Sequence, residues 1–288
     1  MYPEAEGGGA APAEYYPGDT GIKSKLAYHL EGLIPLILIL IIAFFLAIKF
    51  GVVTSGTPVL GIIVDIFEPG ERPAQMLIIG QTSQEVLDVL DANPKLVNYR
   101  IKTAQALERN PKEQLRNYEI VMLDQSEEAN KEISLELGRG IEEYVKTGGK
   151  FILVKDSGIR RPEAYDILGW KNTFRDIVPV TCERKGVMDV PSCISPIIVR
   201  GTINREDFDH PIMEGIEVAP ADPGLYLSVV AFDVTPTGNE IAYIEEGSTR
   251  KTYPAIVEKR LFIGKSIYFN YNPGKTKGIF ESTLRYLK

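Results

Sequence analysis

The chain has 288 residues, 44 % of them hydrophobic, which is enough to form the core of one large domain or two small ones. Its net charge is −7, from 32 basic and 39 acidic residues spread along the sequence, so no basic surface for a phosphate backbone is indicated and nucleic acid is not expected as a partner. The only histidines are His29 and His210, which argues against a metal site built from histidines.

Two segments near the N-terminus carry little sign of a packed core. Residues 1–22 are rich in Gly, Ala, Pro and acidic residues without an apolar period, which predicts a disordered tail. Residues 53–73 mix apolar residues with Gly and Pro and are predicted to be a linker. Within this linker, Val59–Phe67 fits either a short strand or an extension of the apolar helix described next.

Between these segments, residues 23–52 are predicted to form a transmembrane helix with its N-terminal flank. No charged residue occurs from Gly32 to Ile48, and residues 30–50 reach the length that crosses a bilayer. The alternative, a buried helix of a soluble domain, normally keeps a polar stripe that this segment lacks. A cleaved signal peptide is disfavoured because the run is long and no small-residue cleavage site follows it. We therefore expect contact with the lipid bilayer through residues 30–50.

Charges beside this segment favour one orientation slightly. Lys23 and Lys25 precede it, and Lys49 and Arg72 follow it, so the count favours a cytoplasmic N-terminus. The predicted location is a cell membrane crossed once, with the C-terminal domain outside the cytoplasm. A domain attached to the cytoplasmic face remains the alternative.

From residue 74 onward, buried strands alternate with helices. Continuous apolar runs at 76–81, 118–125 and 151–156 predict strands covered on both faces, and 97–103 alternates as a further strand. Thr82 and Ser83 are suited to cap a helix over QEVLDVLDA. The stretch EISLELGRGIEEYVKTGG predicts a second helix that ends at a Gly-Gly stop and buries one face, formed by Ile133, Leu135, Leu137, Ile141 and Tyr144.

This succession predicts an α/β fold with a mainly parallel, flavodoxin-like sheet flanked by helices and preceded by the transmembrane helix. The later runs, such as LYLSVVAFDV and NEIAYIEEG, predict antiparallel strands at one edge of that sheet. The final GIFESTLRYLK predicts an amphipathic helix that turns Ile279, Phe280, Leu284 and Leu287 inward.

The order of these motifs resembles the class I glutamine amidotransferase-like fold, in its ThuA-like and membrane-associated DUF4350-type branches. The motifs are the strand end VMLDQ, the helix end YVKTGG, the strand and corner KFILVKDSG, the turn DHPIMEGI (209–216) and the closing hairpin PAIVEKRLFIGKSIYFNYNPG (254–274). The resemblance covers residues 74–288 and implies an amidotransferase-like α/β domain over that range.

The resemblance also directs attention to the corner after FILV. Catalytic members of the fold place a cysteine there, on a sharp turn that exposes the nucleophile, with a histidine and an acid arriving later. Here the corner reads Lys155, Asp156, Ser157, Gly158 and holds no cysteine. Ser157 would need His210 as its base, and these two are the catalytic candidates. The alternative is that Asp156 and Ser157 bind backbone amides at the strand end.

Other residues suggest ligands less specifically. Asp156, Ser157 and Arg160 lie at the carboxyl edge of the predicted sheet, where open α/β sheets bind ligands. Asp124, with Glu127 and Glu128, fits either a cation site or helix caps. GRGIEEY and GGGAA lack the context of a phosphate loop. We expect neither a metal nor a cofactor.

The two cysteines, Cys182 and Cys193, are eleven positions apart, which fits neither a CxxC redox pair nor a zinc knuckle. A disulfide between them is plausible if the domain lies in an oxidising compartment, and an unbonded pair is the alternative.

Taken together, these patterns predict a non-catalytic, membrane-anchored binding or scaffolding protein, with a protein partner or a second copy of the chain. The alternative is a hydrolase or small-ligand sensor that uses the carboxyl edge of the sheet.

Overall fold

The computed structural model describes residues 72–159, 169–185, 190–193 and 195–288, together with Pro35, Leu38, Ile39 and Ile42. The chain divides into two units, Met1–Pro69 and Gly70–Lys288, and the fold below is that of the second. The predicted tail (1–22) and linker (53–73) fall almost wholly outside the described residues, and so do residues 30–50.

The first part of the domain alternates strands with helices, as the apolar runs predicted. The elements are β1 (Ala74–Ile79), α3 (Gln84–Ala92), β2 (Val97–Lys102), η1 (Gln105–Leu107), α4 (Pro111–Leu115), β3 (Ile120–Leu123), α5 (Leu135–Lys146) and β4 (Lys150–Val154).

The second part is mostly β-structure and closes with one long helix. The elements are α6 (Lys171–Phe174), β5 (Val180–Thr181), β6 (Arg184–Lys185), β7 (Val190–Pro191), β8 (Ile197–Arg205), η3 (Pro211–Met213), β9 (Val218–Ala219), β10 (Leu227–Ala231), β11 (Thr235–Pro236), β12 (Asn239–Glu246), β13 (Thr252–Leu261), β14 (Gly264–Phe269), η4 (Pro273–Lys275) and α7 (Lys277–Leu287).

The central sheet has ten strands, in the order β10-β8-β12-β13-β14-β4-β3-β1-β2, with β9 paired to β8. The strands from β14 to β2 are parallel to one another. The strands from β13 to β10, and β9, pair antiparallel. The prediction of a mainly parallel sheet is therefore wrong, because the antiparallel strands form half of the sheet and not only an edge.

The fold class described here does not include the predicted transmembrane helix, whose residues 23–52 lie almost wholly outside the described part of the chain. Among the residues that the structure describes, no helix has the length and apolar character needed to cross a bilayer. The fold class is accordingly a mixed α/β sheet covered by helices.

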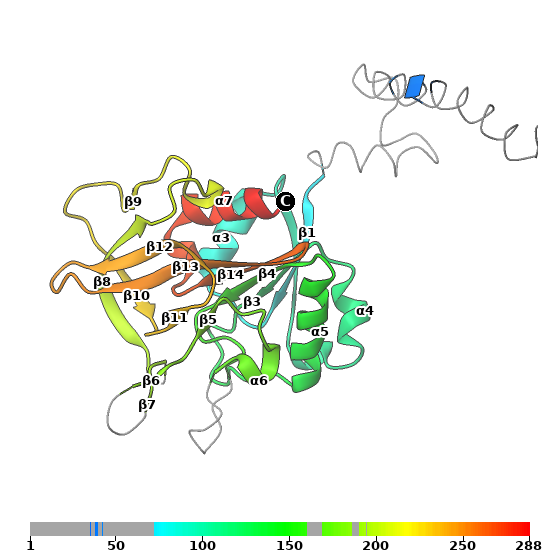
Figure 1. The fold of residues 1–288 in the computed structure, drawn as a ribbon, viewed down its shortest axis with the longest axis horizontal. Helices are drawn as coiled ribbons and strands as arrows, with labels where there is room; N and C mark the ends of the chain where they lie inside the picture. Colours follow the sequence, from blue (N-terminus) through cyan, green and yellow to red (C-terminus); the bar gives the residue numbers. More distant parts are fainter. Residues whose placement is uncertain are drawn as a thin grey trace, which may run out of the picture. The chain divides into compact units, whose positions relative to one another are not determined.

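Helices cover both faces of the parallel part of the sheet (Figure 1). On one face, α3 and α7 pack over a core that includes Met76, Ile78 and Phe280. On the other face, α5 and α6 pack over a core that includes Leu77, Phe151 and Phe174. Adjacent residues of each strand alternate between the two cores, which explains why these strands are continuous apolar runs.

Local sequence signals explain the helix boundaries. Ser83 caps α3 by accepting the N–H of Val86, as predicted. After α5, Gly148 has a φ of +108°, a conformation that glycine adopts without strain. Leu137, Ile141 and Tyr144 of α5 are buried as predicted, whereas Ile133 lies before the helix and Leu135 is exposed. The inward face of α7, with Ile279, Phe280, Leu284 and Leu287, is confirmed.

Asn270 joins the two halves of the sheet directly after β14. Its side chain is fully buried and accepts the N–H of Phe232 at 2.9 Å. Its amide donates to the carbonyls of Phe232 and Pro254 at 2.9 and 2.8 Å. One amide therefore satisfies three backbone groups of neighbouring segments.

Candidate functional site

The corner after β4 has the sharp geometry expected of a nucleophile turn but carries a lysine at its first position. Lys155 has a φ of +50°, in the left-handed region that few non-glycine residues occupy. Its N–H donates to the carbonyl of Phe269 at the end of β14, at 2.7 Å. Strained backbone of this kind persists only where the surrounding structure fixes it. The backbone turn is thus present, and it holds no cysteine, the nucleophile that the resemblance implied for catalytic members.

Ser157 is buried in this corner and its hydroxyl is already used. The Oγ accepts the backbone N–H of Gln125 at 2.8 Å, and Gln125 in turn accepts the N–H of Gly158 through Oε1 at 2.9 Å. The indole of Trp170 donates to the Ser157 carbonyl at 2.9 Å. The side chain of Ser157 has no exposed surface. The prediction that Ser157 binds a backbone amide at the strand end is confirmed.

Asp124, at the end of β3, binds its own turn. Its Oδ1 accepts the N–H of Ser126 at 2.9 Å and the Ser126 hydroxyl, and its Oδ2 accepts the hydroxyl of Thr82. Burial raises the pKa of Asp124, and the hydrogen bonds from Ser126 and Thr82 offset only part of that increase. The carboxylate oxygens therefore point at protein donors of a local turn. Because the next helix begins only at Leu135, the helix cap predicted for Asp124 is not formed. Within the described part of the chain, no group of acidic, histidine or cysteine side chains is placed to hold a metal ion.

Lys131 closes the same corner from the loop before α5. Its ammonium donates to the carbonyls of Gln125 and Ser126. Burial lowers the pKa of Lys131, although the nearby Asp156 favours its charged form. The backbone N–H of Gln125 is thereby bound by Ser157, and its backbone C=O is bound by Lys131. This corner is a closed hydrogen-bonded joint between β3 and β4.

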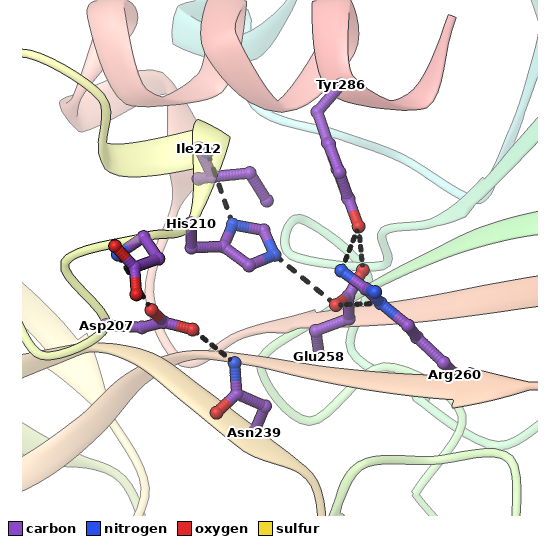
Figure 2. Close-up of polar contacts among 8 residues, drawn as sticks. Asp207, His210, Ile212, Asn239, Glu258, Arg260 and Tyr286 are labelled. Atoms are coloured by element: carbon purple, nitrogen blue, oxygen red, sulfur yellow. Dashed lines mark hydrogen bonds and ion pairs between the residues drawn. The ribbon is translucent and has the colours of Figure 1, made fainter.

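His210 belongs to a second cluster, which lies between η3, β13 and α7 (Figure 2). Its Nδ1 accepts the N–H of Ile212 at 3.2 Å, and its Nε2 lies 3.3 Å from Oε2 of Glu258. Because Nδ1 accepts a hydrogen, the proton of the neutral ring is on Nε2 and is donated to Glu258. Neither nitrogen is left to take a proton from a serine.

Glu258 is the centre of this second cluster, as Figure 2 shows. It accepts the hydroxyl of Tyr286 at 2.6 Å and Nε of Arg260 at 2.9 Å in addition to His210, although only 3 % of its surface is exposed. Burial opposes the charged form, but the hydrogen bonds from His210, Tyr286 and Arg260 prevail and lower the pKa of Glu258 to about 2. The Tyr286 pKa rises to about 12, through burial and through its bond to Glu258.

The two catalytic candidates are not brought together. His210 packs its ring edge-on against Tyr286 of α7, with ring centroids 4.9 Å apart. Ser157 contacts Trp170, which belongs to the core on the opposite face of the sheet. Of the predicted ligand residues, Asp156 lies buried in the corner beside Ser157, and Arg160 falls outside the described residues. A Ser157–His210 catalytic pair is therefore not formed.

Sequence reasoning missed the residues around His210. A cavity of about 500 Å³ lies beside the cluster, lined by Asp207, Asp209, His210, Pro211, Gly238, Asn239, Glu258, Lys259 and Arg260. Glu258 was detectable, because it directly follows the apolar run Ala255–Val257 and shares the inward parity of Ile256, where a charged residue needs a partner. Arg260 is two residues away, but the partners His210 and Tyr286 are 48 and 28 residues away in sequence, so no local pattern indicates them.

The cysteines form a disulfide, as one of the two predicted alternatives. Cys182 and Cys193 have Cα atoms 5.4 Å apart, and Cys193 is fully buried in the core below α6. The bond links the two ends of the segment between β5 and β8.

The comparisons with known proteins concern the fold. No family model matches the sequence, and no curated protein matches it. The fold is similar to that of a ThuA-like protein from Bacteroides uniformis. The two share 10 % identity over 76 % of this chain and 92 % of the other, with a TM-score of 0.50.

Two further structures resemble the domain less closely. The cytoplasmic protein STM3548 from Salmonella typhimurium gives 11 % identity over 74 % of this chain and 98 % of its own, with a TM-score of 0.49. A cold-adapted β-galactosidase from Rahnella sp. R3 gives 13 % identity over 79 % of this chain, with a TM-score of 0.48. The match spans only 34 % of the length of that β-galactosidase. At these identities the likeness concerns the fold alone.

Proposed function

We propose that the domain is a non-catalytic module that binds a protein partner through the free edge of its sheet. The observation that carries the non-catalytic part is the buried Ser157 hydroxyl, which accepts the Gln125 N–H where a nucleophile would have to be exposed. The finer assignment to the class I glutamine amidotransferase-like group belongs to this proposal and rests on the order of the sequence motifs.

The free edge is strand β10, which pairs only with β8 among the described strands. Its five residues, Leu227–Ala231, include no charge and no proline. Sheet edges of soluble proteins usually carry such residues to prevent pairing with other chains. Strand β2 at the opposite edge carries Arg100 and Lys102. It therefore has the protective charges that β10 lacks.

Apolar side chains beside this edge extend the surface available to a partner. Ile198 of β8 and Val230 of β10 are directly opposite each other and are 75 and 41 % exposed. Leu225 and Tyr226, just before β10, are 54 and 46 % exposed. A strand from a partner that pairs with β10 would satisfy its outer backbone groups and cover these side chains.

The binding test compares the two edges in the full-length protein. Val230→Lys is expected to remove a partner that co-purifies with the protein, because a lysine on the edge opposes strand addition. Ile101→Lys, at a 48 % exposed position on β2, is the matched control and should retain the partner. If both variants, with unchanged melting temperatures, retain the same partner, the β10 edge is not the binding surface.

The catalytic test addresses the alternative, a hydrolase at the carboxyl edge. The protein is incubated with ester and amide substrates, and no turnover above background is expected. Turnover that disappears in Ser157→Ala, while the variant stays folded, would establish a hydrolase and overturn the proposal.

The membrane location and the bilayer contact predicted for residues 30–50 stay predictions, because those residues lie almost wholly outside the described part.

A further inference from the structure

The turn between β13 and β14 exposes two large apolar side chains at its tip. Phe262 is 98 % exposed and Ile263 is 75 % exposed, which makes them among the most exposed large apolar residues described. Phe262 has a φ of +55°, in a two-residue turn where glycine or asparagine is the usual choice. Turn preference and solvent both disfavour an aromatic residue here. Neither folding nor solubility therefore explains why the tip is apolar.

Basic residues lie on the strands beside this tip. Arg260 and Lys265 stand directly opposite each other on the two strands of the hairpin. Like charges in this relation destabilise a hairpin. Lys150, at the start of β4, is close enough to affect the protonation of Lys265. Its ammonium also donates to a backbone oxygen of Lys288 at 3.2 Å, whereas the Lys288 ammonium donates to the Lys95 carbonyl at 3.1 Å.

The basic group around the tip contrasts with the rest of the chain. The whole sequence has a net charge of −7. The acidic residues near these cations are Glu258, which already binds Arg260, and Glu119, which pairs with Arg72. The tip thus presents an aromatic and an aliphatic side chain beside Arg260, Lys265 and Lys150. Of these, Lys265 also lies over the Tyr286 ring, with its ammonium 3.8 Å from the ring centroid.

The tip is braced by the end of α5. A Cβ at Gly148 would lie 3.1 Å from Cδ1 of Ile263, and a Cβ at Gly264 would overlap the carbonyl oxygen of Val145. A large residue at either glycine would move the turn. The apolar pair is consequently held outward by rigid elements.

From this geometry we infer that the β13–β14 turn docks onto an anionic lipid surface, with Phe262 and Ile263 entering the interface and the surrounding cations contacting the headgroups. Protruding apolar side chains enter the headgroup region favourably, and aromatic rings are preferred there. Lysine and arginine beside them are attracted by anionic headgroups. A protein partner would need a matching pocket for a narrow tip, whereas a fluid interface needs none. The charge complementarity therefore favours lipid.

The test places a fluorescent reporter at the tip of the full-length protein. The native cysteines are joined, so Ile263→Cys supplies a selectively reactive thiol for an environment-sensitive dye. Ile198→Cys is the matched control, since Ile198 and Ile263 are both 75 % exposed. The probes are vesicles of phosphatidylcholine alone, and of phosphatidylcholine with phosphatidylserine, each carrying nitroxide-labelled acyl chains.

The dye at 263 is expected to shift to the blue and to be quenched by the vesicles that contain phosphatidylserine, and the dye at 198 to stay unchanged. High salt should reduce the effect, because it screens the headgroup charge. Lys265→Gln in the same background should raise the vesicle concentration for half-maximal shift about fivefold.

Three results would overturn the inference. The first is no shift at 263 with either vesicle. The second is an equal shift at 198, or with phosphatidylcholine alone, which would indicate adsorption unrelated to the cations beside the tip. The third is a shift at 263 that grows with protein concentration and needs no vesicles, which would assign the tip to a second copy of the chain. The dye at 198 lies beside the β10 edge and reports on it, whereas the dye at 263 does not, so this inference and the proposed function fail separately.

Discussion

Replacing Glu258 with glutamine tests the energetic importance of the cluster around His210. The change keeps the shape of the side chain and removes its charge, while His210, Tyr286 and Arg260 remain as donors. A pKa of about 2 in the folded protein, against an ordinary value of 4.5, corresponds to about 3 kcal/mol of stability at about 1.4 kcal/mol per pKa unit. Loss of one partner from a buried charged pair has a similar cost. We therefore expect Glu258→Gln to lower the free energy of unfolding by about 3 kcal/mol at neutral pH.

The sign of the pH dependence follows from the direction of this shift. Because the folded-state pKa of Glu258 lies below its ordinary value of 4.5, its contribution is fully present above pH 4.5 and declines as the pH falls toward about 2. The stability difference between the wild type and Glu258→Gln should shrink over the same range. Other carboxylates affect both proteins alike, so the difference isolates this one group.

The assay is urea unfolding monitored through Trp170, the only tryptophan, which is 2 % exposed in the same domain. Glu214→Gln is the control, because Glu214 is exposed, and it should change the stability by less than about 0.5 kcal/mol. A loss below about 1 kcal/mol in Glu258→Gln, or a loss that does not depend on pH, would refute the reasoning.

Three further substitutions test the joints of the domain. Ser157→Ala leaves the buried N–H of Gln125 without a partner and should cost about 1–3 kcal/mol, measured by urea unfolding, with no effect on any hydrolysis. Cys182→Ser opens the loop closed by the bond to Cys193; loop-closure entropy predicts a loss of about 3 kcal/mol, and treatment of the wild type with a reductant should reproduce it. Asn270→Leu strands three buried backbone groups and should lower the melting temperature more than Ser157→Ala does; an equal or smaller effect would contradict the role of Asn270 as the joint of the sheet.

Much of the local structure was predictable because it depends on neighbouring residues. Ser83 caps α3, Gly148 ends α5, and the apolar face of α7 follows its helical period. The proportion of antiparallel pairing was not predictable in the same way. A strand buried on both faces is an apolar run in either direction, so sequence alone does not say that β13 and β12 continue the sheet beyond β14.

The candidate site was predictable only in part, for a related reason. The corner at Lys155–Gly158 follows directly from the strand before it, so its position and the absence of a thiol could be read from the chain. The use of Ser157 by Gln125 depends on a contact across 32 residues. Glu258, the side-chain partner of His210, lies 48 residues away, and no motif connects the two. Residues that come into contact only when the sheet folds have no fixed spacing in the sequence, so no motif predicts the contact.

The position of β14 between β4 and β13 has a consequence for synthesis on the ribosome. The first four strands of the domain can pair as soon as they emerge, but the open side of β4 waits for Gly264–Phe269, because Lys265 follows its partner Lys150 by 115 residues (265 − 150). The antiparallel hairpins meet the same strand from the other side. A nascent chain that stalls before this segment therefore carries two unpaired sheet borders, which are the surfaces that chaperones protect and that aggregation uses. Completion of the sheet is in this way tied to synthesis of β14.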